Sequence, residues 1–171
     1  ARRVVSDEDL APSLGGDGGP ELAPALGATP PLGRAWWHSL KGPISVLLAD
    51  LERGTPTVRR RAAEALVRMG DRRAVPALAE RCRDEHPEVR LACVKALARL
   101  GGDGALPALH RACQDSHAHV RLAAAEGVAR LGNESSLGVL ETLRGHACDY
   151  GLPSDVVAVE RAIAELTRRL G

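Results

Sequence analysis

The sequence predicts an all-α protein built from stacked helical hairpins, and three observations carry this prediction. The chain has 171 residues, 44% hydrophobic and 26% charged, which is a globular composition with enough apolar material for one domain. Phe is absent, Tyr occurs once and Trp twice, so Ala, Leu and Val must form the core, which favours close-packed helices over sheets. Beyond residue 42 the sequence also repeats, with Val58, Val89 and Val120 each 31 residues apart.

The first 30 residues are predicted to be a disordered, low-complexity linker or tail. Residues 1–42 hold 7 Gly and 5 Pro, including the run 15–20 with the sequence GGDGGP. Such a composition buries too little apolar surface to offset the entropy of ordering the chain. The alternative is a segment that folds on a partner, for which Glu21–Leu26 is the candidate.

Each repeat is predicted to contain two helices. Val58, Ala62, Leu66 and Met69 stand at i, i+4, i+8 and i+11, which is one stripe of an α-helix, and Gly70 ends that helix. A shorter second helix follows. The stripe recurs at 89–100 and 120–131 before Gly101 and Gly132, and the inward residues of the second helices are Val75, Leu78 and Cys82, then Leu106, Leu109 and Cys113.

Prolines mark where the units begin. Pro56, Pro87 and Pro153 are predicted at the first helical position, where the missing N–H costs nothing. Residues 31–171 therefore divide into a leading partial unit (31–54), regular units (55–85, 86–116 and 117–147) and a closing helix (154–170). Trp36 and Trp37 lie about 100° apart on a helix, so we expect one of them to cover the apolar end of the array.

A sequence motif in the middle units points to a family. The run 84–90 (DEHPEVR), followed by Ala96-Leu97, Leu100-Gly101 and then Pro107-Ala108-Leu109, resembles the HEAT-like repeats named after phycobilisome lyases. The resemblance covers about residues 43 to 171. It implies a right-handed α-solenoid that serves as a scaffold or adaptor for another protein. A chaperone-like or lyase-like component acting on a chromophore protein is the alternative, although no motif in the chain matches a bilin-handling residue.

The sequence predicts no catalytic activity, no cofactor and no bound metal. Cys113 recurs as Cys82 and His117 recurs as His86, so these residues return once per layer, which favours packing over metal binding. The alternative to packing is a metal site formed by His110, Cys113, His117 and His119, joined by His146 and Cys148.

Asp84 and Asp115 also recur once per unit, with Arg90 and Arg121 one helical turn beyond the start of the helix that follows each of them. An acidic ladder for recognition is one interpretation. We favour a structural one, in which each Asp accepts hydrogen bonds from the exposed N–H groups of the next hairpin or pairs with the recurring Arg.

A protein partner is predicted to bind the exposed face of the second helices, taken as the concave side. A nearly neutral trough of small residues there would admit a peptide or helix of another protein. The predicted partner-binding residues are Ala77, Glu80, Arg81, Ala108, Arg111, Ala112, Val139, Thr142 and Leu143.

Charge and composition argue against binding to nucleic acid and against insertion into a membrane. Lys and Arg total 23 against 22 Asp and Glu, so no global field attracts nucleic acid or an anionic membrane. The third hypothesis for the function is nucleic-acid binding, which is disfavoured. It would use the arginine-rich first helices, with Arg68, Arg99 and Arg130. No apolar stretch approaches the roughly 18 residues that span a bilayer. The four cysteines are expected to be reduced thiols, which predicts a cytoplasmic location. The oligomeric state is not predicted beyond a preference for a monomer.

Overall fold

The structure is a computed structural model that describes residues 42–171. The predicted linker (1–30) and the start of the predicted partial unit (31–41) lie outside these residues. The described chain is helical and contains no strand. Its elements are α1 (Pro43–Arg53), α2 (Pro56–Met69), the 3-10 turn η2 (Arg72–Ala74), α3 (Val75–Arg81), α4 (Pro87–Leu100), α5 (Ala105–Ala112), α6 (Ala118–Leu131), α7 (Glu134–Asp149) and α8 (Pro153–Leu170).

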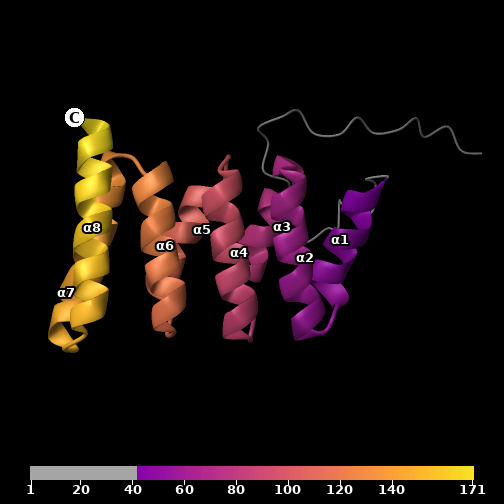
Figure 1. Ribbon diagram of the computed structural model, residues 1–171, viewed down its shortest axis with the longest axis horizontal. Coiled ribbons are helices and arrows are strands. Elements are labelled where there is room, and N and C mark those ends of the chain that lie inside the picture. The colour runs from indigo at the N-terminus through magenta and orange to yellow at the C-terminus, as the bar shows by residue number, and fades with distance from the viewer. Residues whose placement is uncertain (1–41) are drawn as a thin grey trace, which may run out of the picture.

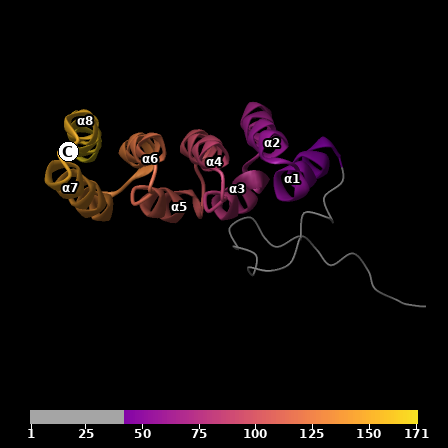
Figure 2. The ribbon, with the colours of Figure 1, turned by 90° about the horizontal axis from the view of Figure 1, so that it is seen from below.

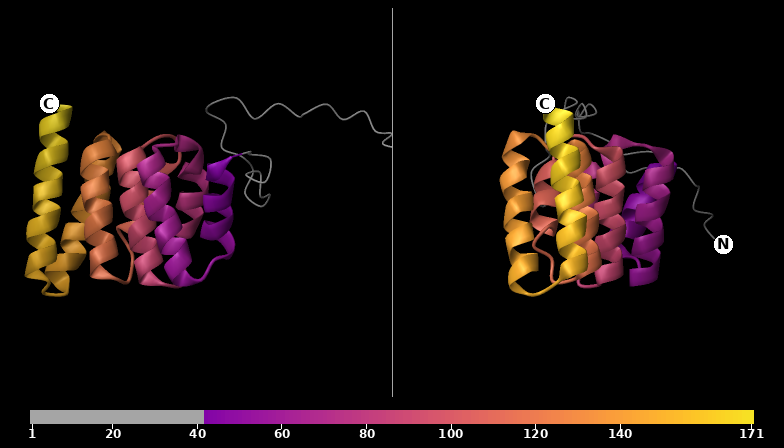
Figure 3. Two further views of the ribbon diagram at one scale, coloured as in Figure 1. Left: turned by 45° about the vertical axis from the view of Figure 1, so that its right-hand side comes forward. Right: turned by 60° about the vertical axis from the view of Figure 1, so that its left-hand side comes forward.

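The helices form two layers in a single row, as Figure 1 shows. The first-helix layer contains α2, α4, α6 and α8, and the second-helix layer contains α1, α3, α5 and α7 (Figure 2). Neighbours in the first-helix layer pack on one another, and α3, α5 and α7 each pack on the first helix of the following unit. The side views in Figure 3 show the same row of upright helices. The predicted all-α solenoid is therefore confirmed.

The core runs along the row between the layers. Leu66 and Leu97 of the first helices are fully buried, as are Leu78, Leu109 and Leu140 of the second helices. Each of these side chains lies where a first helix meets second helices, so every unit completes the core of its neighbours. A single unit of this kind has no closed core of its own.

Prolines begin the helices as predicted, with Pro56, Pro87 and Pro153 at the first turn. The glycines that end the first helices differ from one another. Gly70 takes the left-handed conformation (φ 68°, ψ 13°), Gly101 also has positive φ (62°) but with ψ −157°, and Gly132 has φ −64°. A Cβ at position 132 would come within 2.9 Å of Ser136, so close approach requires glycine there.

The row is bowed only slightly, and the first-helix layer lies on the inner side of the bow (Figure 2). The prediction that the second helices line the concave side is therefore wrong. The physical reason is the difference in packing between the layers. First helices contact each other closely from α2 to α8, whereas α5 and α7 make little direct contact and stand further apart.

A ladder of ion pairs joins each first helix to the start of the next first helix. The guanidinium of Arg90 on α4 contacts the carboxylate of Asp115 through two nitrogens, at 2.7 and 2.9 Å. A third nitrogen of Arg90 donates to the carbonyl oxygen of Asp84 at 2.9 Å, so one side chain binds the loops on both sides of the α4–α5 hairpin. The other two rungs are Arg59–Asp84 at 2.7 Å and Arg121–Asp155 at 2.8 Å.

The structural interpretation of the recurring aspartates is confirmed for the backbone hydrogen bonds, but Asp84 and Asp115 pair with Arg59 and Arg90, one repeat earlier than Arg90 and Arg121. Asp84 accepts from the backbone N–H of His86 at 3.0 Å, and Asp115 accepts from that of His117 at 2.9 Å, so each carboxylate also orders its own loop. The arginine partner of each Asp lies on the first helix that precedes its loop, and not on the first helix that follows it. In the last rung Asp155 replaces the loop aspartate from within the first turn of α8, because four extra residues precede that helix.

These contacts change how the aspartates titrate. Burial by itself raises the pKa of Asp115, but hydrogen bonds from Arg90 and from the backbone of His117 outweigh it and lower the pKa below its ordinary value. The pKa of Asp84 is lowered in the same way, by Arg59 and the backbone of His86. A lowered folded-state pKa means that the stabilisation is present above the unfolded-state pKa and is lost as the pH falls through the folded-state value.

The ladder predicts acid sensitivity. We expect the free energy of unfolding to fall as the pH drops below about 4, where aspartates of ordinary pKa begin to protonate. Asp115→Asn should cost about 2 kcal/mol at pH 7, because Arg90 loses a charged acceptor, and should lose less on acidification than the wild type. Urea denaturation between pH 7 and 3 measures both effects. Asp103→Asn, at an exposed site, is the control, and equal acid losses in wild type and Asp115→Asn would contradict the prediction.

The buried apolar stripe predicts that shortening one of its side chains in a middle unit strongly lowers the free energy of unfolding. Leu97→Ala should lower the free energy of unfolding by about 2 to 5 kcal/mol, because the side chain is fully buried with neighbours on both sides. Leu170→Ala, at a side chain that is 40% exposed, is the matched control and should cost far less. Urea denaturation monitored by circular dichroism measures both, and equal losses would mean that the packing register is wrong.

Candidate functional site

Hollows open on the second-helix layer, and Arg111 of α5 lines two of them. The smaller, of about 330 Å³, lies between the ends of α3 and α5, where Ala108 and Ala112 also contribute to its wall. The larger, of about 400 Å³, lies between α5 and α7, and we call it the α5–α7 crevice. Its lining residues are His110, Arg111, Cys113, Gln114, Ser135, Gly138, Val139, Thr142, Leu143 and His146.

The structure brings together part of the predicted partner-binding set. Arg111, Val139, Thr142 and Leu143 line the α5–α7 crevice, although Leu143 is buried at its base. The three predicted residues from α3 line neither hollow: Ala77, Glu80 and Arg81.

The predicted trough of exposed small residues is wrong. Ala77, Ala108 and Ala112 are buried, with Ala108 only 1% exposed. Small side chains let α3 and α5 approach their neighbours closely, and that close approach covers the side chains themselves. Arg81 is also engaged, since it donates to the carbonyl oxygen of Glu52 at 3.0 Å and thereby satisfies the end of α1. Substituting Ala108 would therefore disturb the core, and it does not test a surface.

The α5–α7 crevice owes its open edge to a glycine within α7. A Cβ built on Gly138 would meet no atom within 4 Å, so the space beside it is empty. Gly138 stands in register with Pro76 and Pro107 of the preceding units. Leu143 and the half-buried Val139 supply apolar surface next to this edge. The sequence signal that would have located the crevice was this glycine in the interior of a predicted helix.

A histidine and a serine meet at one wall of the crevice. His110 Nε2 lies 2.9 Å from Ser136 Oγ. The hydroxyl also accepts from the backbone N–H of Asn133 and contacts its side-chain oxygen, each at 3.1 Å. Because Ser136 is fully buried and caps α7, its oxygen is not available as a nucleophile. Burial lowers the pKa of His110, so this imidazole is neutral at pH 7.

The fixed charge at the crevice is positive. Arg111 is exposed, and its guanidinium has no hydrogen bond or ion pair to any residue that the structure describes. The lining of the crevice contains no carboxylate. An anionic group on a bound molecule would therefore be attracted to the mouth of the crevice and would find an unpaired guanidinium there.

The metal candidates do not assemble into a site. His110, Cys113 and His146 line the same crevice, but their ligand atoms form no cluster within 4.8 Å. Burial raises the pKa of the Cys113 thiol to about 12, which disfavours the thiolate that binds metal. Within residues 42–171 one such cluster exists, formed by Asp84, Glu85 and His86. Its buried carboxylate is already paired with a guanidinium, which would repel a cation.

The two layers of repeated hairpins, joined by one ion pair per unit, define a short α-solenoid. The family model of HEAT repeats matches residues 44–109 and again residues 82–158. The chain belongs to the HEAT repeat family. No curated protein is detectably similar to it in sequence. Within the described residues no helix is both long enough and apolar enough to cross a bilayer.

The crevice predicts that two glycines in α7 are dispensable for folding. Gly138→Leu and Gly145→Leu should each raise the free energy of unfolding by about 0.5 to 1 kcal/mol, because glycine is a poor helix residue and neither new side chain meets a neighbour at its Cβ. Urea denaturation measures the change. A clear loss of stability in Gly138→Leu would show that the crevice is closed in solution.

Proposed function

We propose that this chain is a non-catalytic scaffold that binds a short segment of another protein in the α5–α7 crevice. HEAT repeats are commonly protein-interaction scaffolds, which supports the general class. The observation that carries the proposal is the crevice itself, with apolar surface at Val139 and Leu143, an open edge at Gly138 and the unpaired Arg111. Thr142, which the sequence also predicted to contact the partner, lines the same crevice.

The same features specify the chemistry of the partner. The apolar surface suits one aliphatic or aromatic side chain, and the guanidinium of Arg111 suits a carboxylate beside it. A helix or an extended peptide with an acidic residue next to an apolar anchor meets both requirements. Four free cysteines, three of them buried, support action in a reducing compartment such as the cytoplasm.

Capture of the partner from a lysate of the native host, with proteins identified by mass spectrometry, tests this function. Wild type and Gly145→Leu should retain the same protein, whereas Gly138→Leu should lose it, because the new side chain fills the crevice without disturbing the fold. Arg111→Glu should also abolish capture. Arg144→Glu, an exposed residue of α7 outside the crevice, should not.

Retention of the partner by both Gly138→Leu and Arg111→Glu would place the binding site elsewhere on the solenoid. Identical losses in Gly138→Leu and Gly145→Leu would show that α7 as a whole is sensitive, and would refute the crevice as the site.

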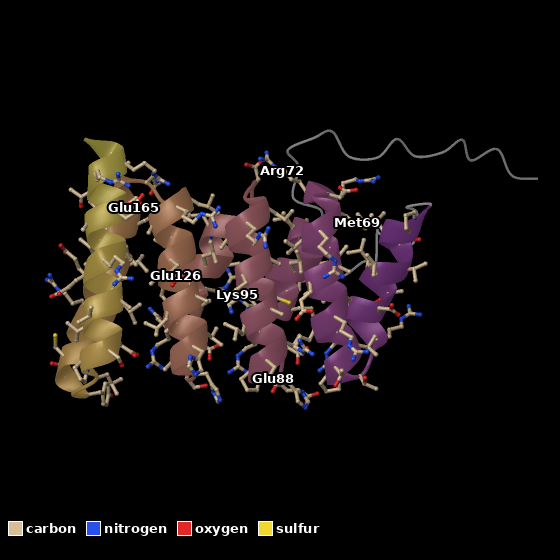
Figure 4. The ribbon with its side chains drawn as sticks, in the orientation of Figure 1. Met69, Arg72, Glu88, Lys95, Glu126 and Glu165 are labelled. Atoms are coloured by element: carbon tan, nitrogen blue, oxygen red, sulfur yellow. The ribbon has the colours of Figure 1, made fainter. Side chains whose placement is uncertain are left out.

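One observation bears on the nucleic-acid alternative. Arg68, Arg99 and Arg130 are exposed at equivalent positions of successive first helices. The same face also carries acidic groups, and Figure 4 shows Lys95 and Glu126 side by side on neighbouring helices. This mixture of charges suits a solvated surface better than a phosphate backbone. Strong, salt-dependent retention on DNA would reverse this preference.

The resemblance to phycobilisome-lyase repeats stays a prediction, since the family match is to HEAT repeats in general. Absorbance of the protein at bilin wavelengths after purification from its native host tests it directly.

A further inference from the structure

The first-helix layer begins one helix later than the second-helix layer. α1 stands in line with α3, α5 and α7, so it is the second helix of a leading unit (Figure 2). Each of α4, α6 and α8 packs on the first helix that precedes it. Within residues 42–171, α2 has no such predecessor, and one of its faces is left without a helical partner.

The side chains on that face are apolar and unusually exposed. Val58 is 37% exposed, whereas Val89, at the equivalent position of α4, is fully buried. Met69 is 42% exposed, whereas its equivalents Leu100 and Leu166 are 8% and 0% exposed and Leu131 is partly buried. Figure 4 shows Met69 near the end of α2. The residue types are those of a packed interface, and the preceding helix that buries them in the other units is what α2 lacks.

Incomplete burial of an apolar side chain is also found on α1. Leu47 is only partly buried, whereas Leu78 and Leu109, at equivalent positions of α3 and α5, are fully buried. Ala65 of α2 is partly exposed where Ala96 of α4 is fully buried. We call the surface formed by Leu47, Val58, Ala65 and Met69 the α2 end face.

The turn that leads into α1 shows where the missing helix connects. Gly42 precedes α1 with φ +108°, and Gly104 precedes α5 with φ +87°. The two glycines stand 62 residues apart, which is twice the repeat. Gly104 lies in the connection between the first and second helices of its unit. The chain therefore enters α1 through the kind of turn that follows a first helix.

The sequence just before this turn carries apolar residues at helical spacing. Leu32, Ala35, Trp36 and Leu40 stand at i, i+3, i+4 and i+8, which would form one stripe, and Trp37 lies about 100° away from Trp36. Trp36 and Trp37 are the two tryptophans of the chain.

We propose that residues 31–41 of the same chain cover the α2 end face and act as the first helix of the leading unit, with Trp36 against Val58 and Met69. The short connection through Gly42 holds this segment beside the face at a high effective concentration, which favours it over a second copy of the chain. The proposal is independent of the α5–α7 crevice, which lies toward the other end of the row.

Tryptophan fluorescence of the full-length chain tests the proposal, because single replacements leave one reporter at a time. In Trp37→Phe, the remaining Trp36 should emit at shorter wavelength and be quenched less by acrylamide than the remaining Trp37 in Trp36→Phe. Adding Val58→Glu to Trp37→Phe should shift the emission to longer wavelength and raise quenching to the level of the urea-unfolded protein. Adding Val157→Glu, at an exposed apolar residue of α8, should change neither.

Circular dichroism checks that each variant remains folded; Val58 is partly exposed, so its replacement should leave the helical signal intact. If Val58→Glu nevertheless unfolds, Met69→Glu makes the same comparison. Quenching of Trp36 as complete as in urea, before any change at the α2 end face, would overturn the proposal. So would protection that appears only with dimerisation in light scattering, because a second copy would then cover the face.

Discussion

The pairing of one arginine with one aspartate per repeat is the constraint on which the rest of this solenoid depends. Arg90 contacts the carboxylate of Asp115, in the loop that leads into the next first helix, and the carbonyl of Asp84, in the loop that leads into its own helix. Because both partners are largely buried, the geometry tolerates little variation in the spacing of units. The extra residues before α8 illustrate this, since Asp155 restores the contact from a different place in the sequence.

The ladder fixes the first-helix layer more tightly than the second. Arg59, Arg90 and Arg121 all lie on first helices, which pack closely in sequence. The second helices are held mainly by the first helix of the following unit, so they can separate from each other. α5 and α7 do separate, and the crevice with Gly138 at its edge is the result.

The two ends of the row differ in the same physical terms. On α8 the residue equivalent to Arg90 is Val156 and the residue equivalent to the buried Val94 is the exposed Glu160, so this helix carries a charge where the internal helix is apolar, although Val157 is also exposed. On α2 the apolar pattern of an internal helix continues to the edge of the described structure. That contrast supports the proposal that a further segment covers the α2 end face.

The sequence by itself determined the repeat, the two helices of each unit, the proline starts and the backbone hydrogen bonds of the aspartates, because helical periodicity and local capping depend on residues close in the chain. It also identified Arg111, Val139 and Thr142 as residues of one face. Only the tertiary structure decided that Ala77, Ala108 and Ala112 are buried, that the first helices lie on the inner side and that a crevice opens between α5 and α7. Those outcomes depend on how closely whole helices approach each other, and a small residue at a helix surface is compatible with either a covered interface or an open groove until its neighbours are in place.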